Sequence, residues 1–229
     1  MDSFYEADKN CEEIVSKWIQ DKIFTPQSFN GVYIRNENIQ LQKSGIDFFL
    51  QSPHIFGDNK KYAVDEKCAT SYIKTNIEDN NMPTFAFELD YQGQDGTRNQ
   101  GWLFGDQFTK TEYYLICWLW AEIDKKDKKY LKDQVTYNNI SKMKALLINK
   151  EKIQNYISSF HINNKNYMRA SKRLREEKKE TSIPLNPNKN KKTPKILQTK
   201  HLVEKPVNII ISEHDLIKLS DEFWEDIRP

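Results

Sequence analysis

The sequence is short of glycine, cysteine and long apolar runs. Only 7 of its 229 residues are glycine, below the average of roughly 7%, which weighs against collagen-like, glycine-linker and phosphate-loop sequences. The three cysteines (Cys11, Cys68 and Cys117) are far apart and odd in number, so a disulfide framework and a zinc ribbon are excluded and a reducing compartment fits. No run approaches the roughly 18 apolar residues of a membrane helix, and the N-terminus lacks the pattern of a secretory signal. We expect a cytoplasmic protein with no membrane association.

A large net charge is also missing, but the charge is unevenly distributed. The chain has 35 basic and 33 acidic residues. Residues 165–200 contain 12 Lys and Arg against 3 Asp and Glu, which leaves 23 basic and 30 acidic residues elsewhere. Such asymmetry favours a polyanion partner, although a solvated charged loop is the alternative. The candidate phosphate contacts in and around this segment are Arg169, Lys172, Arg173, Arg175, Lys191 and Lys192.

Hydrophobic periodicity predicts a mixture of helices and strands. Residues 4–23 carry an apolar stripe at helical spacing, formed by Cys11, Ile14, Val15, Trp18 and Ile19. Alternating or continuous apolar runs predict strands at residues 31–35, 45–50, 61–70, 84–91, 112–123, 144–149 and 207–212. Capping residues Asn149 and Ser212 predict helices over 150–160 and 213–224. The fold class is therefore α/β, with a central mixed β-sheet flanked by helices.

The order of these elements predicts one core with an insertion. Residues 1–164 are expected to form the α/β core, and 206–229 to return to it as a strand and a helix. The basic segment between them, residues 165–205, contains Pro184, Pro187 and Pro194 among Asn and Lys. That composition predicts a largely unstructured insertion, whose start could extend a helix.

Charged residues lie inside two of the predicted apolar strands. Asp65 and Lys67 are two residues apart on one strand, so they project from the same face. Asp47 lies likewise within the preceding strand. Such groups are costly to bury without partners, and two neighbouring carboxylates can bind Mg²⁺. The alternatives are a solvent-facing pair at Asp65 and Lys67, and an edge charge at Asp47.

This arrangement resembles the PD-(D/E)XK nuclease superfamily, which has the restriction-endonuclease-like fold. Gly45-Ile46-Asp47 stands where that family has Pro-Asp, and Asp65-Glu66-Lys67 stands where it has (Asp/Glu)-x-Lys. The proline is missing. The resemblance covers roughly residues 8–123. It implies a restriction-endonuclease-like core in which Asp47, Asp65 and the backbone carbonyl of Glu66 hold Mg²⁺, for which Mn²⁺ can substitute. Lys67 would then position the attacking water.

Members that resemble Holliday-junction resolvases carry a Glu on the first helix that completes the metal site. Glu12 and Glu13 are the candidates here, and Glu12 is preferred because it borders the apolar stripe at 3.6 residues per turn. Glu88 could be a peripheral ligand. The resemblance implies a catalytic set of Glu12, Asp47, Asp65 and Lys67 and a two-fold homodimer.

We therefore expect a metal-dependent nuclease acting on DNA rather than RNA. An RNA-cleaving, toxin-like nuclease of the same fold is one alternative. A non-catalytic nucleic-acid-binding module is another, and an α/β scaffold with an acidic partner-binding face is a third.

Overall fold

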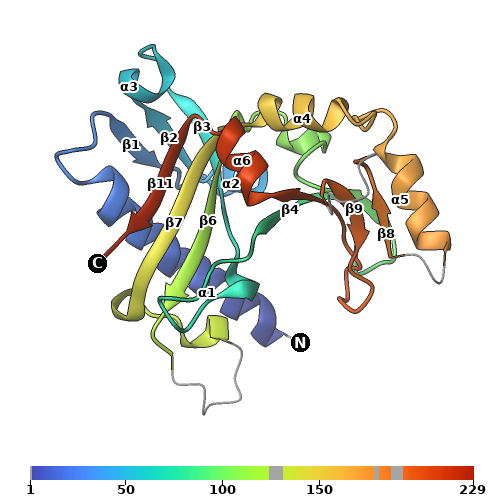
Figure 1. Ribbon diagram of the computed structural model, residues 1–229, viewed down its shortest axis with the longest axis horizontal. Coiled ribbons are helices and arrows are strands. Elements are labelled where there is room, and N and C mark those ends of the chain that lie inside the picture. Colours follow the sequence, from blue (N-terminus) through green and yellow to red (C-terminus); the bar gives the residue numbers. More distant parts are fainter. Residues whose placement is uncertain (1, 124–130, 178–180, 187–192) are drawn as a thin grey trace. The chain divides into compact units, whose positions relative to one another are not determined.

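The chain folds into two compact units in a computed structural model that describes residues 2–123, 131–177, 181–186 and 193–229 (Figure 1). Unit 1 comprises Met1–Met82, Tyr113–Ile148 and Ser220–Pro229, and unit 2 comprises Pro83–Glu112 and Asn149–Leu219. The protein is α/β, as predicted, with a mixed six-stranded sheet and an antiparallel five-stranded sheet.

Unit 1 is built on the six-stranded sheet, whose strands follow the order β1-β2-β3-β6-β7-β11. Strands β1, β2 and β3 pair antiparallel in sequence, and β3 pairs parallel with β6. The helices and strands of unit 1 are α1 (Asp2–Ile19), β1 (Val32–Arg35), α2 (Ile39–Lys43), β2 (Phe48–Gln51), α3 (Pro53–Phe56), β3 (Tyr62–Cys68), β6 (Tyr113–Ala121), β7 (Ile140–Asn149) and β11 (Glu222–Ile227). One π-helical turn, Gln20–Phe24, extends α1.

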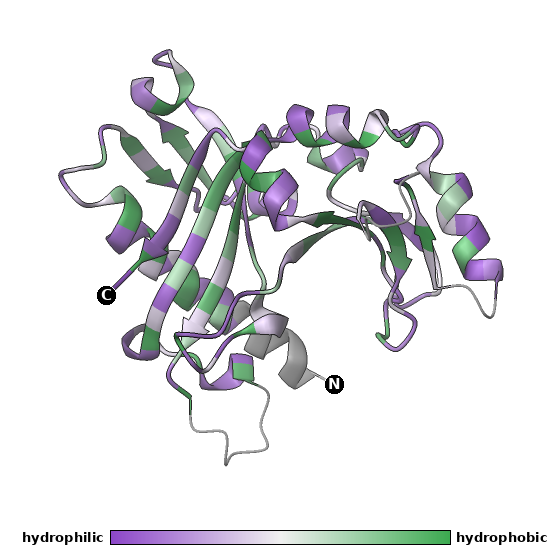
Figure 2. Cartoon of the chain, in the orientation of Figure 1, coloured by the Kyte–Doolittle hydropathy of each residue, from purple (hydrophilic) through white to green (hydrophobic). Residues whose placement is uncertain are grey.

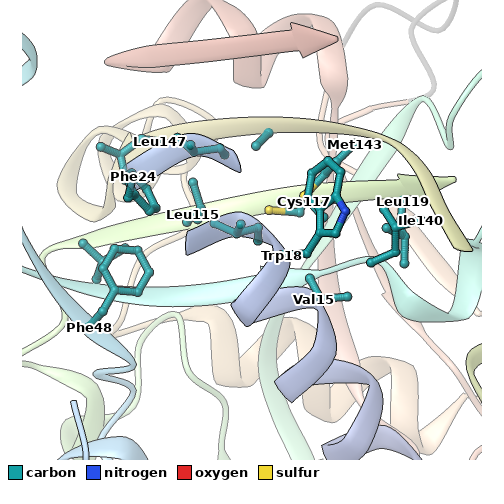
Figure 3. Packing of buried hydrophobic residues seen from close by; sticks show 14 of the residues in the cluster. Val15, Trp18, Phe24, Phe48, Leu115, Cys117, Leu119, Ile140, Met143 and Leu147 are labelled. Carbon is teal, nitrogen blue, oxygen red and sulfur yellow. The ribbon is translucent and has the colours of Figure 1, made fainter. Parts of the chain in front are cut away.

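The core of unit 1 lies between α1 and the sheet. Val15 and Trp18 of α1 are buried and pack in one cluster with Leu115 and Cys117 of β6 (Figure 3). All nine residues of β6 are buried, which explains its continuous apolar and aromatic sequence. The predicted helical stripe and the predicted central strand are therefore confirmed.

Strand β3 has two chemically different faces. Val64 and Cys68 point to the α1 side, where they join the core cluster. Asp65 and Lys67 point to the opposite side, where Asp65 lies beside Tyr114 in the register of β3 and β6. The alternation of a strand thus brings both predicted site residues to one face.

Unit 2 contains the five-stranded antiparallel sheet, with the order β5-β4-β10-β9-β8. Its elements are β4 (Thr84–Gln92), β5 (Arg98–Gln100), α4 (Lys150–Ser158), α5 (Tyr167–Glu176), β8 (Ser182–Pro184), β9 (Lys195–Gln198), β10 (Val207–Ser212) and α6 (Glu213–Leu219). The predicted caps are present: the Asn149 side chain accepts from two amides of α4, and Ser212 Oγ accepts from Asp215 N.

A buried carboxylate joins three elements of unit 2. Asp90 of β4 is 1% exposed and forms ion pairs of 2.5 Å with Arg98 of β5 and Arg175 of α5. Each oxygen of the carboxylate receives a different guanidinium. The arrangement satisfies a charge that would otherwise be costly to bury.

Three sequence predictions differ from the structure. Residues 1–164 do not form a core by themselves, because residues 83–112 and 149–164 belong to unit 2. The segment 165–205 is not largely unstructured in its described part, since it contains α5, β8 and β9. The helix predicted over 213–224 ends at Leu219, because Glu222–Ile227 pair with β7 instead. The residues described contain no helix that could span a membrane.

The ion pairs of Asp90 predict a large effect on stability. Asp90→Ala leaves Arg98 and Arg175 without their buried counter-charge and should lower the free energy of unfolding by about 3–5 kcal/mol. Urea unfolding followed by circular dichroism measures the change. Glu176→Ala removes an exposed carboxylate that pairs with Lys172 at 3.7 Å and should have little effect. Equal unfolding midpoints for the two variants would contradict the structural role of Asp90.

Candidate functional site

Asp47 lies directly before β2 and is fixed by backbone hydrogen bonds. Its amide donates to Val64 O at 2.9 Å, and its carbonyl accepts from Asn36 N at 2.9 Å. Its side chain is also held, because Oδ2 accepts from Glu66 N at 2.7 Å. The hairpin of β2 and β3 therefore carries the Asp47 carboxylate to the strand that contains Asp65.

Asp65 and Lys67 form a close ion pair on β3. Lys67 Nζ lies 2.6 Å from Asp65 Oδ1. The Asp65 carboxylate is 1% exposed, whereas the Lys67 side chain is 29% exposed. The Asp47 carboxylate lies close to Asp65, because its Oδ2 is 2.7 Å from the amide of the next residue, Glu66, and its charge raises the pKa of Asp65. The structure thus brings Asp47, Asp65 and Lys67 together.

Burial and neighbouring charges change the proton affinities of Asp65 and Lys67. Burial raises the pKa of Asp65 to about 7; Lys67 opposes the increase and Asp47 adds to it. Burial alone would lower the pKa of Lys67, but Asp65 and Asp47 outweigh it and raise that pKa. Lys67 is therefore an ammonium at neutral pH. In that state it can donate hydrogen bonds and stabilise negative charge, but it cannot accept a proton.

Glu66 points to the other face of β3, toward α1. Its Oε2 lies 3.9 Å from Arg35 Nη1, and its side chain is 8% exposed. Arg35 also donates a hydrogen bond to Ser16 of α1. Burial raises the pKa of Glu66 to about 8, Asp47 adds to the increase and Arg35 opposes it.

The three glutamates considered as further metal ligands lie at different places in the structure. Glu12 is exposed on α1, and its charge acts on Glu66 and Lys67, whose pKa values it raises. Glu13 is also exposed on α1. Glu88 belongs to β4 in unit 2, outside the unit that contains Asp47 and Asp65.

The basic residues expected to contact phosphates fall into three groups. Arg169, Lys172 and Arg173 are exposed on α5. Arg175 is on the same helix, but its guanidinium pairs with the buried Asp90, so its first role is structural. Lys191 and Lys192 lie outside the described residues.

The donor atoms at Asp47 and Asp65 suit a hard divalent cation. Among the described residues, Asp65 Oδ2 and Glu66 Oε2 are buried without a hydrogen-bond partner. The described residues contain no cluster of three or more His, Cys, Asp or Glu side chains arranged around a metal. Mg²⁺ does not require such a cluster, since it commonly takes one or two carboxylates and keeps several waters. The orphaned oxygen of Asp65 beside Asp47 fits that requirement.

Sequence reasoning missed the groups that support this site. Asn36, directly after β1, holds the segment that carries Asp47, since its side chain donates to Ile46 O at 2.5 Å and its amide donates to Asp47 O at 2.9 Å. Ser16 and Arg35 surround Glu66. Ser16 follows Glu12 by four residues, so helical spacing places both on one face of α1. That spacing was the available signal, whereas the contact of Arg35 with Glu66 depends on tertiary structure.

The comparisons with known proteins give no match. No family model matches the chain, and no match was found among the curated proteins or the solved structures.

The raised pKa values predict how stability depends on pH in the metal-free protein. Asp65 and Glu66 have folded pKa values of about 7 and about 8, above the unfolded values of roughly 4. Between about pH 4 and pH 8 the folded state binds more protons, so the free energy of unfolding should fall as pH rises. Glu66→Gln should flatten this decrease in urea unfolding with EDTA, whereas Glu176→Gln, at an exposed position, should leave it unchanged. Identical pH dependence in wild type and Glu66→Gln would contradict the assignment.

Proposed function

We propose that the protein is a Mg²⁺-dependent nuclease that hydrolyses phosphodiester bonds, of DNA in the first instance. The observation that carries the proposal is the buried Asp65 carboxylate, which lies beside Asp47 and 2.6 Å from Lys67. A carboxylate as buried as that of Asp65, with the half-buried Asp47 carboxylate beside it, is costly without a compensating partner. Lys67 compensates one oxygen of Asp65, and a divalent cation would compensate the other.

The order of these residues along the chain supports the same proposal. Asp47 precedes β2, and Asp65-Glu66-Lys67 lies within β3, its antiparallel neighbour. This is the layout expected from the resemblance to PD-(D/E)XK nucleases. On this basis we also propose a restriction-endonuclease-like core for unit 1.

Each residue has a distinct part in the proposed reaction. Asp47 and Asp65 would hold the cation through carboxylate oxygens, with the Glu66 carbonyl as a further ligand, and Glu12 would add to the negative field at the edge of the site. Bound Mg²⁺ lowers the pKa of a coordinated water and polarises a phosphoryl oxygen. The Lys67 ammonium would orient that water and stabilise charge on the phosphorane.

The atoms balance as in simple hydrolysis. The water oxygen bonds to phosphorus and the water gives up a proton to solvent. The bond from phosphorus to the 3′ oxygen breaks, and that oxygen takes a proton from solvent and leaves as a hydroxyl. The products are a 5′-phosphate and a 3′-hydroxyl. The exposed Arg169, Lys172 and Arg173 of α5 would contact backbone phosphates, which contribute affinity with little sequence information. A two-fold homodimer would allow both strands of a duplex to be cut.

The proposal predicts metal binding that depends on both aspartates. Saturating Mg²⁺ or Mn²⁺ should raise the melting temperature of wild type, because a ligand at 100 times its dissociation constant stabilises by about 2.7 kcal/mol. Asp47→Asn and Asp65→Asn should each lose this shift in differential scanning fluorimetry. Asp79→Asn, at an exposed position of unit 1, should retain it. A full shift in Asp65→Asn would show that the cation binds elsewhere.

It also predicts cleavage that depends on Lys67. Purified protein should cut DNA with Mg²⁺ or Mn²⁺ and not with EDTA, and Lys67→Ala should lower the rate about 100-fold or more, as for other positioned charges in active sites. Lys61→Ala removes an exposed lysine immediately before the same strand and should keep the activity. Plasmid DNA and total RNA assayed in parallel distinguish a DNase from an RNase. No cleavage of either by wild type would refute the proposal.

A further inference from the structure

Unit 2 contains a polar pocket that the proposed reaction does not use. It encloses about 600 Å³ at the start of α4, within the range of ligand-binding pockets. Its walls come from residues 104–112, from α4, and from Asn163 and Asn164 before α5. All of these residues belong to unit 2, so the pocket is a feature of that unit alone.

The walls of the pocket are fixed to one another. Lys150 of α4 is 7% exposed, and its Nζ donates to Phe108 O at 2.7 Å and to Trp102 O at 3.3 Å. Gln154 donates to Leu103 O at 2.9 Å, one helical turn further along. The loop and the helix are therefore held together before any ligand binds, which lowers the entropic cost of binding.

At the pocket wall, the backbone at Gly105 lies close to the backbone at Gly101. Its amide donates to Gly101 O at 2.9 Å, and an added Cβ would lie 2.7 Å from that oxygen. A larger residue could not keep this turn. The loop geometry that shapes the pocket thus depends on glycine in a chain that has few.

The side chains of the pocket suit the hydrogen-bonding edge of a nucleobase. Amides dominate the lining, and three carboxylates accompany them; these residues are Asn149, Gln154, Asn155, Asn163, Asn164, Asp106, Glu112 and Glu151. Amides can donate and accept, and carboxylates accept from exocyclic amino groups. The ammonium of Lys150 is directed to loop carbonyls, and it is the one basic side chain in the described lining. The pocket therefore does not have the character of a phosphate site.

An aromatic ring completes the lining. Phe104 lines the pocket and stacks on Tyr167 of α5, with the ring centroids 5.4 Å apart and an interplanar angle of 22°. Aromatic rings beside amide and carboxylate groups are the usual means of holding an unstacked base.

The same ring contact joins the pocket to the basic helix. Helix α5 buries Tyr167, Ser171 and Leu174, so its opposite face is exposed. That face carries Arg169, Lys172 and Arg173, and hydrophilic positions alternate with hydrophobic ones along α5 in Figure 2. Unit 2 thus has two neighbouring features. One is a polar pocket whose described lining offers no free cation, and the other is a basic surface on α5 suited to phosphates.

We propose that the pocket of unit 2 binds an unstacked, amino-bearing nucleobase of a single-stranded segment, while α5 holds the adjacent phosphates. Cytosine and adenine carry exocyclic amino groups, which can donate hydrogen bonds to the carboxylate of Asp106, Glu112 or Glu151. Thymine and uracil carry no such group. This inference rests on the proposed function in taking nucleic acid as the substrate. It does not require cleavage, so the two can be tested separately.

The test is equilibrium binding in EDTA, measured by fluorescence anisotropy with labelled oligo-dC, oligo-dA and oligo-dT of one length and at one salt concentration. Wild type should bind oligo-dC or oligo-dA at least about five-fold more tightly than oligo-dT, the discrimination expected of a good base contact. The double variant Glu151→Gln/Asn155→Ala should lose this preference. Both positions are exposed on α4, where the replacements are good helix formers, and circular dichroism checks the fold.

Arg169→Ala is the matched control. It removes a phosphate contact, so it should weaken binding of all three oligonucleotides by a similar factor and leave their ratio unchanged. Equal affinities in wild type, or an unchanged preference in the double variant, would overturn the inference. Lys67→Ala should keep the preference while it loses cleavage. A wild type that shows the preference but cuts nothing would refute the nuclease and leave the base pocket in place.

Discussion

Burial of the Asp65 carboxylate in the middle of β3 is the constraint on which the proposed function depends. The strand is parallel to the fully buried β6 on one side and antiparallel to β2 on the other, and Asp65 is 1% exposed. Lys67 engages one oxygen at 2.6 Å, and the other has no hydrogen-bond partner among the described residues. The rest of the site responds to this charge: Asp47 raises the pKa of Asp65, and Asp65 in turn keeps Lys67 protonated.

Such an arrangement lowers the stability of the folded protein. Local rules of burial and pairing are satisfied at Asp90, whose carboxylate forms ion pairs with Arg98 and Arg175. They are violated at Asp65 and Glu66, where burial raises both pKa values. Violations of this kind are concentrated at functional sites. The contrast between a satisfied carboxylate in unit 2 and unsatisfied ones in unit 1 distinguishes a structural ion pair from a candidate active site.

Much of unit 1 follows from local sequence patterns. The stripe on α1, the buried β6 and the hairpin that brings Asp47 toward Asp65 are encoded by periodicity and short spacings. The division into two units is not, because β4 pairs with β10, more than a hundred residues later. Residues 222–224 were predicted to end a helix, yet they belong to β11 because β7 offers a partner at that edge of the sheet. Arg35 and the pocket of unit 2 were missed for the same reason, since tertiary contacts create both.

The central claim is that Asp47 and Asp65 share a divalent cation. The most direct measurement is an anomalous difference map from crystals of the protein soaked in Mn²⁺. The account predicts a peak within about 2.0–2.3 Å of one carboxylate oxygen of each aspartate, with the remaining positions filled by water or the Glu66 carbonyl. No peak between the two carboxylates in a crystal where Mn²⁺ binds at other sites would contradict it.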